Sequence, residues 1–179
     1  MVLTIKRYGE DDPIDYKLIR SDIKVKDITY SGMVSPTTGY IRLNRFSRNT
    51  TNEINQAFKD LIKNDVKEVI IDLRDNGGGL LTAAVNMIDM LIEKGQTIVS
   101  TKGRMKESNR SFLSRTKPII DKDVKIAILI NQGSASASEI VAGSIQDLDR
   151  GIIIGRKSFG KGLVQTLYPI DKIRSLKVT

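Results

Sequence analysis

From about residue 39 onward, short apolar segments alternate with amphipathic ones, which is typical of an α/β layer. The segment 68–73 (Glu-Val-Ile-Ile-Asp-Leu) is almost continuously apolar, as expected for a strand that is covered on both faces. A glycine-rich loop follows it, and apolar residues then recur at helical spacing over about 80–92. The chain is therefore predicted to have an α/β fold.

Local patterns predict the individual elements. The predicted strands are 2–7 and 14–19, which would form a hairpin, followed by 23–28, 40–43, 68–73, 97–100, 125–130, 151–154 and 163–170. Three helices are predicted. The first is capped by Thr51 and buries Ile54, Phe58, Leu61 and Ile62 on one face. The second covers about 80–92 and is ended by Lys94-Gly95, and the third covers about 136–148.

The charge balance permits several kinds of partner. At 179 residues the chain is long enough to bury a core, and it carries 29 Lys and Arg against 21 Asp and Glu. The net charge of +8 would allow binding to nucleic acid or to an anionic surface. The basic stretch 102–125 is interrupted by Glu107, Asp121 and Asp123, and Phe112 is its only aromatic residue. A solvated basic face is the favoured interpretation, and no nucleic-acid partner is predicted.

The sequence gives limited information on location. No run of 18 apolar residues occurs, so no transmembrane segment is predicted in this chain. The first residues, Met-Val-Leu-Thr-Ile-Lys-Arg, alternate in polarity and do not resemble a signal peptide, which leaves export open if further residues precede them. The absence of cysteine does not identify a compartment.

The chain contains no histidine and no cysteine. A serine hydroxyl is a poor nucleophile until a base takes its proton, so covalent catalysis by this chain would require a lysine amine as the base. A lysine amine accepts a proton only when it is uncharged, and burial among apolar groups favours the uncharged form. Lys161 lies between Phe159 and Leu163 in sequence, which permits such a setting.

A glycine loop forms the first candidate site. The segment 72–79 (Asp-Leu-Arg-Asp-Asn-Gly-Gly-Gly) lies between a predicted strand and a predicted helix. Glycines allow backbone N–H groups to approach a ligand closely, and a helix start favours an anion. The alternative interpretation is a tight turn in which Asp75 and Asn76 act as local caps. The loop alone does not decide between the two.

The segment 155–161 (Gly-Arg-Lys-Ser-Phe-Gly-Lys) matches the first part of a phosphate-binding P-loop. Gly162 stands where a magnesium-binding Ser or Thr would be needed, and strand-like residues follow where a helix should begin, so the nucleotide interpretation is disfavoured. In a strand, Lys161, Leu163 and Gln165 would point to the same side. Lys161 and Gln165 could then face one site.

The third candidate site is a serine cluster in the segment 131–139 (Asn-Gln-Gly-Ser-Ala-Ser-Ala-Ser-Glu). Ser136 and Glu139 fit a capping box, and an N-cap serine contributes about 1 kcal/mol of helix stability. The functional interpretation uses the same geometry, because backbone N–H groups at a helix start can stabilise an oxyanion next to a nucleophile. Without other information, the structural role is favoured.

At these residues the chain resembles the C-terminal processing peptidases, or tail-specific proteases, which are serine endopeptidases with a Ser–Lys dyad. The resemblance covers about residues 22–165. It rests on the motifs Asp-Leu-Arg-x-Asn-x-Gly-Gly, Gly-Ser-Ala-Ser-Ala-Ser-Glu and Ser-Phe-Gly-Lys-Gly-x-Val-Gln. The family's nucleophile falls on Ser136 and its general base on Lys161, 25 residues later, which is the family's usual separation. Gln165 falls on a glutamine that orients the base in some members.

The resemblance implies further site residues. The oxyanion donors would be the backbone N–H groups of Ala137 and of a glycine in 77–79, with Gly78 preferred. Asp147 matches an aspartate of accessory importance in other members. The resemblance implies a polypeptide substrate and an acyl-enzyme intermediate, no metal or organic cofactor, and an extracytoplasmic location in the cell envelope or outside the cell. It leaves homo-oligomerisation open.

The resemblance also implies a domain organisation. The family core is an α/β fold related to the ClpP and crotonase superfamily, usually preceded by a PDZ domain that binds substrate C-termini. Residues 1–21 resemble only the last strands of such a domain, and 22–179 would be a peptidase core that is truncated at its C-terminus. A catalytically incomplete peptide-binding or scaffold module of the same fold is the main alternative function. An acyl-CoA enzyme is a third interpretation, by fold analogy alone.

Overall fold

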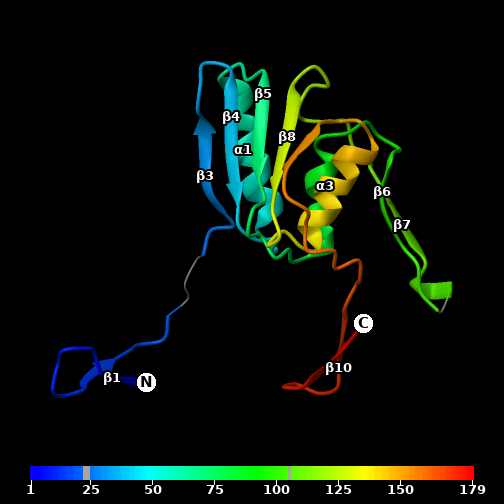
Figure 1. Ribbon diagram of the computed structural model, residues 1–179. Helices are drawn as coiled ribbons and strands as arrows, with labels where there is room; N and C mark the ends of the chain where they lie inside the picture. Colours follow the sequence, from blue (N-terminus) through cyan, green and yellow to red (C-terminus); the bar gives the residue numbers. More distant parts are fainter. Residues whose placement is uncertain (22–24, 105) are drawn as a thin grey trace.

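The computed structural model describes residues 1–21, 25–104 and 106–179. Its centre is a five-stranded sheet with the order β3-β4-β5-β8-β9 (Figure 1). The strands are β3 (Ile28–Met33), β4 (Thr38–Leu43), β5 (Glu68–Asp72), β8 (Lys125–Ile130) and β9 (Ile152–Gly155). β3 pairs antiparallel with β4, and the other neighbours are parallel. The carboxyl ends of β4, β5, β8 and β9 therefore share one edge.

Three helices cover one face of this sheet: α1 (Thr50–Lys63), α2 (Leu81–Asp89) and α3 (Ala137–Asp147) (Figure 1). Alternate strand residues point toward them, and each buried Ile, Leu or Phe side chain contributes about 1.5–3 kcal/mol relative to exposure. The core between sheet and helices includes Ile41, Leu43, Ile71, Ile128, Ile54, Phe58, Ala84, Ile88, Val141 and Ile145. Within the described residues, none of the helices combines the length and apolar character that crossing a bilayer requires.

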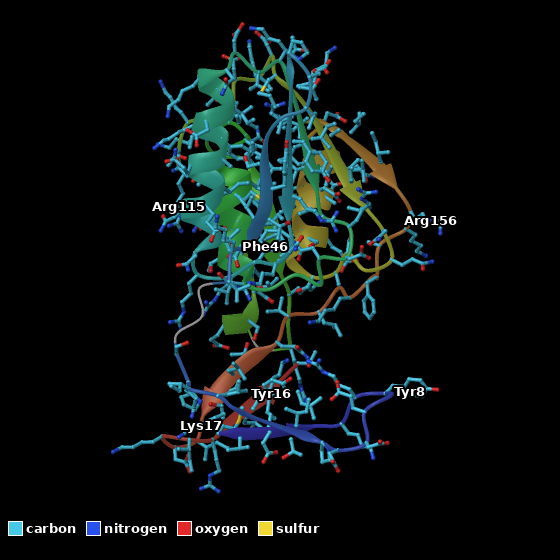
Figure 2. The ribbon with its side chains drawn as sticks, turned by 90° about the vertical axis from the view of Figure 1, so that its left-hand side faces the viewer. Tyr8, Tyr16, Lys17, Phe46, Arg115 and Arg156 are labelled. Carbon is cyan, nitrogen blue, oxygen red and sulfur yellow. The ribbon has the colours of Figure 1, made fainter. Side chains whose placement is uncertain are left out.

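Three two-stranded pairs lie outside the central sheet. They are β1 (Val2–Ile5) with β2 (Ile14–Lys17), β6 (Thr97–Thr101) with β7 (Arg110–Leu113), and β10 (Thr166–Pro169) with β11 (Ser175–Val178); the 3-10 turn η1 (Lys106–Ser108) joins β6 to β7. Figure 2 shows Tyr16 and Lys17 on the first pair, away from Phe46 at the edge of the main sheet. The predicted N-terminal hairpin is confirmed.

The structure corrects several predicted elements. The predicted strand 23–28 lies partly outside the described residues, and the observed strand starts at Ile28. Asn49, not Thr51, precedes the first helix, and Ile62 is exposed because it lies on the solvent side of α1. β5 is fully covered on one face only, since Ile70 on the other face stays partly exposed.

The predicted ends of other elements also differ. The strand predicted over 163–170 shortens to β10, and α2 ends at Asp89 although Leu91 and Ile92 remain buried beyond it. β7 and β11 were not predicted. Each is only four residues long, and although Ser-Leu-Lys-Val of β11 alternates in polarity, so short a pattern is a weak signal for a strand.

Asp72 forms a buried ionic cluster at the end of β5. Its side chain is fully buried and accepts hydrogen bonds from the Tyr40 hydroxyl (2.5 Å) and from Arg42 (2.8 Å). Arg74 donates from its backbone N–H (2.9 Å), Nε (2.9 Å) and Nη2 (2.6 Å). Burial raises the pKa of Asp72, but these hydrogen bonds outweigh it and lower the pKa from 3.8 to about 2. The cluster fixes the start of the loop after β5.

The free energy of unfolding is expected to fall as the pH drops from 5 to 2. The unfolded chain binds a proton at Asp72 near pH 4, whereas the folded chain does so near pH 2, so this contribution is complete above pH 5 and is lost toward pH 2. For Asp72 it amounts to about 2 kcal/mol. Urea denaturation as a function of pH measures it. An Asp72→Asn variant should be less stable at pH 7 and depend less on pH, and an unchanged pH dependence would contradict this account.

Candidate active site at the carboxyl edge of the sheet

Three loops leave the carboxyl ends of neighbouring parallel strands and meet at one edge of the sheet (Figure 1, lower edge). Residues 73–80 follow β5, 131–136 follow β8, and 156–161 follow β9. Hydrogen bonds join them: the Ala135 N–H donates to the Asn76 carbonyl (3.1 Å), and the Phe159 N–H donates to the Ser134 carbonyl (3.0 Å). Ligand sites of parallel α/β sheets are found at this edge.

Ser136 lies on a strained turn between β8 and α3. Its φ is 58° and its ψ is −113°, a conformation that costs a non-glycine residue about 1–3 kcal/mol. The turn places Ser136 at the N-cap of α3, where the predicted capping box is confirmed: the Ser136 N–H donates to Glu139 Oε2 (2.7 Å). A strained serine between a strand and a helix also characterises the nucleophile elbow of serine hydrolases.

The two flanking serines are structural. Ser134 and Ser138 are fully buried, and their hydroxyls donate to the carbonyls of Leu73 (2.7 Å) and Asn76 (2.8 Å) respectively. Ser136 is only half-buried. Among the described residues, the middle serine is therefore the one member of the cluster that is partly exposed and whose hydroxyl donates no hydrogen bond.

Asn76 organises the glycine loop beside Ser136. It is fully buried, its Nδ2 donates to the Leu43 carbonyl (2.8 Å), and its Oδ1 accepts from the Gly78 N–H (2.9 Å). Its carbonyl accepts from Ala135 and Ser138. The structure therefore gives Asn76 the local role that its sequence position suggested, and extends that role to the serine turn.

Gly78 packs directly against the serine turn. Its φ is +94°, and a Cβ atom there would lie 2.5 Å from the Ala135 carbonyl oxygen, 2.8 Å from Ser136 Cβ and 2.9 Å from the Ala137 nitrogen. The two predicted oxyanion residues are thus adjacent. The Gly78 N–H is used by Asn76, whereas the Ala137 N–H has no hydrogen-bond acceptor in the described part of the chain. Of the two predicted donors, Ala137 is the free one.

The backbone of Lys161, and not its amine, is bonded to the site. Its N–H donates to Glu139 Oε2 (3.1 Å), while its amine donates to Gln165 Oε1 (3.4 Å). Within residues 1–21, 25–104 and 106–179, no hydrogen bond joins the amine to the Ser136 hydroxyl. Phe159 and Leu163 are 68% and 60% exposed, so the predicted apolar setting for the amine is not formed by these two neighbours.

For the segment 155–165, the structure corrects one prediction and agrees with another. Residues 161–165 are not in a strand, so the Lys161–Gln165 contact arises from the loop and not from a two-residue repeat. No helix follows Lys161 either, since the next regular element is β10, which agrees with the prediction that this segment is not a P-loop. Gly155 and Gly160 both have positive φ, which explains the glycines of this segment by backbone geometry.

Asp147 is not part of the site in this structure. It is the last residue of α3, and the 11 residues of this helix separate it from Ser136 by roughly 16 Å. It is exposed and has no ion pair within the described residues. The structure thus brings together Ser136, Ala137, Gly78 and the backbone of Lys161, with Gln165 near the Lys161 amine, and leaves Asp147 at the opposite end of the helix.

Glu139 is the residue whose wider role the sequence did not predict. The capping box marks it as a partner of Ser136, but its carboxylate also accepts from the Ser158 hydroxyl (2.8 Å), the Gly160 N–H (2.6 Å) and the Lys161 N–H. Burial raises the pKa of Glu139, but these hydrogen bonds outweigh it and hold the pKa below the usual range. No sequence signal links Glu139 to 158–161, because that contact depends on the approach of two loops.

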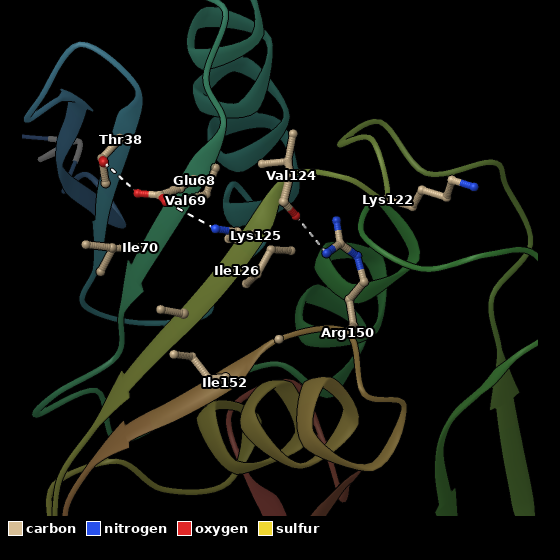
Figure 3. Close-up of a pocket in the computed structure, with 12 residues that line it drawn as sticks. Thr38, Glu68, Val69, Ile70, Lys122, Val124, Lys125, Ile126, Arg150 and Ile152 are labelled. Atoms are coloured by element: carbon tan, nitrogen blue, oxygen red, sulfur yellow. Dashed lines mark hydrogen bonds and ion pairs between the residues drawn. The ribbon is translucent and has the colours of Figure 1, made fainter.

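A separate hollow of about 470 Å³ lies at the other end of the strands (Figure 3). Its lining includes Glu68, Lys125 and Ile152, the first residues of β5, β8 and β9, whereas Ser136 follows the last residue of β8. Arg150 beside it donates to the carbonyls of Leu91, Val124 and Asp121. In the described ranges, no group of three His, Cys, Asp or Glu side chains could hold a metal ion.

Residues 37–179 match the family model described as peptidase family S41. The chain belongs to peptidase family S41. Along its whole length, the S41 chain is 44% identical to a carboxy-terminal-processing protease of Bartonella bacilliformis and covers 41% of that protein. It is 39% identical, again along its whole length, to a "Probable CtpA-like serine protease" of Staphylococcus epidermidis and covers 35% of it.

The fold of this chain is also similar to that of a solved structure. The photosystem II D1 C-terminal processing protease matches 88% of the S41 chain with a TM-score of 0.70 and 33% sequence identity, and 43% of that protein is covered. The S41 chain thus spans less than half the length of these relatives. The predicted family and the α/β fold are confirmed.

Substitution of Gly78 by alanine is expected to destabilise the protein far more than the same change at Gly77. At Gly78 the added Cβ would meet backbone atoms at less than 3 Å in a left-handed conformation, whereas at Gly77 nothing lies within 4 Å. Gly78→Ala should cost roughly 2 kcal/mol of unfolding free energy, and Gly77→Ala about 0.5 kcal/mol or less. Urea denaturation of both variants measures the difference, and equal stabilities would contradict the observed packing.

The strain at Ser136 predicts the relative stability of two variants at this position. Ser136→Gly should be more stable than Ser136→Ala by about 1 kcal/mol, because glycine adopts a positive φ without the penalty that Cβ imposes. Thermal and urea unfolding of the two variants provide the measurement. If the alanine variant were the more stable one, Ser136 would not have a left-handed φ.

Proposed function

We propose that this chain is the catalytic core of a serine endopeptidase that cleaves polypeptides near their C-termini through a Ser–Lys dyad. The main support is the position of Ser136, a partly exposed serine on a strained turn that is packed against Gly78 and tied through Glu139 to the peptide of Lys161. Membership of family S41 and the names of the relatives support the same chemistry.

In the proposed mechanism, Ser136 Oγ attacks the scissile carbonyl carbon and the Lys161 amine takes the hydroxyl proton. The resulting oxyanion accepts a hydrogen bond from the Ala137 N–H and from the glycine loop at Gly78. When the C–N bond breaks, Lys161 returns its proton to the leaving amine and an ester to Ser136 remains. Water then attacks this ester while Lys161 takes a proton from it. When the bond from the carbonyl carbon to Ser136 Oγ breaks, Lys161 returns that proton to Oγ, which releases the acid product and restores the hydroxyl and the uncharged amine.

Two movements complete the site in this proposal. The Lys161 amine donates to Gln165 Oε1 at 3.4 Å in this structure. When substrate is bound, the amine turns toward Ser136, and Gln165 orients the amine in that position. The Gly78 N–H exchanges Asn76 Oδ1 for the oxyanion. Catalytic hydrogen bonds are often long or poorly aligned without substrate and tighten in the complex, so both movements are compatible with a resting state.

The wider organisation also follows from the resemblance. We propose that residues 1–21 form the last strands of a PDZ domain, that 22–179 belong to a ClpP- and crotonase-like peptidase core, and that the complete protein works outside the cytoplasm. The antiparallel β1–β2 hairpin supports the first point, since it is a two-stranded sheet separate from the central one. The accessory role of Asp147 remains a prediction for the longer protein.

Activity of the full-length protein is expected to require Ser136 and Lys161. Ser136→Ala and Lys161→Ala should each lower kcat by at least about 10³-fold without changing the circular dichroism spectrum. Lys157→Ala is the matched control, because Lys157 is an exposed lysine of the same loop, and its kcat should stay within about threefold of wild type.

A fluorophosphonate probe separates the peptidase from a peptide-binding module of the same fold. Labelling that disappears in Ser136→Ala but persists in Lys157→Ala supports the peptidase. Binding of a peptide without any labelling of the wild type would instead support the module, and turnover by Ser136→Ala or Lys161→Ala at the wild-type rate would remove the mechanism.

A further inference from the structure

The Glu139 carboxylate accepts four hydrogen bonds from two different loops. The Ser136 N–H donates to Oε2 (2.7 Å) and the Lys161 N–H donates to the same oxygen (3.1 Å). Oε1 accepts from the Ser158 hydroxyl (2.8 Å) and from the Gly160 N–H (2.6 Å). No ion pair of Glu139 is present among the described residues, so the carboxylate is held by these donors alone.

A capping box explains only one of the four bonds. In such a box, the carboxylate of the third helical residue accepts from the N-cap N–H, which here is the Ser136–Glu139 bond. The other three donors belong to 158–161, a segment that is distant in sequence and contributes nothing to the start of α3. Glu139 therefore has a second role, which concerns the position of that segment.

The segment after β9 depends on these contacts. No regular element is present between Gly155 and Thr166. Apart from the bonds to Glu139, two backbone hydrogen bonds join this segment to the rest of the described chain. The Arg156 N–H donates to the Ile130 carbonyl (3.1 Å), and the Phe159 N–H donates to the Ser134 carbonyl (3.0 Å). Beyond Phe159, the Gly160 and Lys161 N–H groups are held by Glu139.

We propose that Glu139 is a positioning residue that sets the distance between Ser136 and Lys161, by holding the backbone N–H groups of both on one carboxylate oxygen. This inference rests on the proposed Ser–Lys mechanism. Glu139 does not touch the substrate or the reacting atoms. It fixes the two main-chain positions from which the hydroxyl and the amine extend, and a displacement of about 1 Å between reacting groups can cost about 100-fold in rate.

Glutamine at position 139 separates this role from packing. Its amide has nearly the same size, but only its oxygen accepts, and its NH₂ group would face donors. Glu139→Gln therefore cannot keep all four bonds. Glu139→Asp retains the charge but is one methylene shorter, so it cannot reach both loops in the same way.

Glu53 offers a matched control on α1. Its carboxylate is also half-buried and accepts two backbone N–H groups, from Asp27 (3.0 Å) and Ile28 (2.9 Å), at a place remote from Ser136 in the chain. Glu53→Gln should lower the melting temperature through the same kind of lost hydrogen bond. It should leave kcat within about threefold of wild type.

The kinetic test uses the full-length protein and a peptide substrate, at a temperature where every variant is folded. Glu139→Gln is expected to lower kcat about 100-fold with KM within about threefold, because ground-state binding does not require the aligned dyad. Glu139→Asp should lower kcat by at least about tenfold. This variant replaces Glu139→Gln as the kinetic test if the glutamine variant does not fold. A kcat of either variant within threefold of wild type would overturn the proposal.

Amide hydrogen exchange gives a readout that does not depend on activity. In Glu139→Gln, protection of the Gly160 and Lys161 amides should fall about tenfold together with that of Ser136, as expected for lost hydrogen bonds. A residue that only caps α3 would change Ser136 and leave Gly160 and Lys161 protected, which would overturn the positioning role. If the wild-type protein showed no turnover, the proposed function would fail while the exchange result would still decide whether Glu139 joins the two loops.

Discussion

The parallel pairing of β5, β8 and β9 is the constraint on which the candidate site depends. In this register Asp72 lies beside Leu129, and Leu129 beside Ile154, so the three strands end at nearly the same level. The loops that follow them must then leave the sheet at one edge. A glycine loop, a serine turn and a lysine segment that are far apart in sequence become neighbours through this pairing alone.

Buried polar groups then fix the loops to within hydrogen-bond distance. Asn76, Ser134 and Ser138 are all fully buried, and each donates its side-chain N–H or O–H to a backbone carbonyl of another segment. An unsatisfied buried polar group costs about 1–3 kcal/mol, so each of these contacts disfavours any other loop arrangement. The strain at Ser136 is maintained because its surroundings are fixed in this way.

The sequence predicted those features that depend on neighbouring residues. The apolar period located β5, β8 and α3 nearly to the residue, and the serine–glutamate spacing predicted the capping box. The sequence also predicted the three loops as candidate sites, because glycines and serines are concentrated there. Family resemblance, not spacing, distinguished Ser136 from Ser134 and Ser138, and their burial now gives the physical reason.

Features that depend on contacts between distant segments were not predictable in the same way. The positive φ of Ser136, the use of the Gly78 N–H by Asn76, and the bonds from Gly160 and Lys161 to Glu139 arise only when the loops meet. The strand expected over 163–170 forms only over Thr166–Pro169, where the chain pairs with β11. Exposure does not distinguish the two parts, since Leu163 and Leu167 are both exposed, so the pairing partner sets where the strand begins.

The central claim is that a lysine amine serves Ser136 as its base, and a stable analogue of the tetrahedral intermediate tests it most directly. The measurement is a crystal structure of the full-length protein with a peptide boronate bonded to Ser136 Oγ. The account predicts that the Lys161 Nζ lies about 3 Å from that oxygen. A well-ordered adduct in which the amine stays on Gln165, more than about 5 Å from Ser136 Oγ, would contradict it.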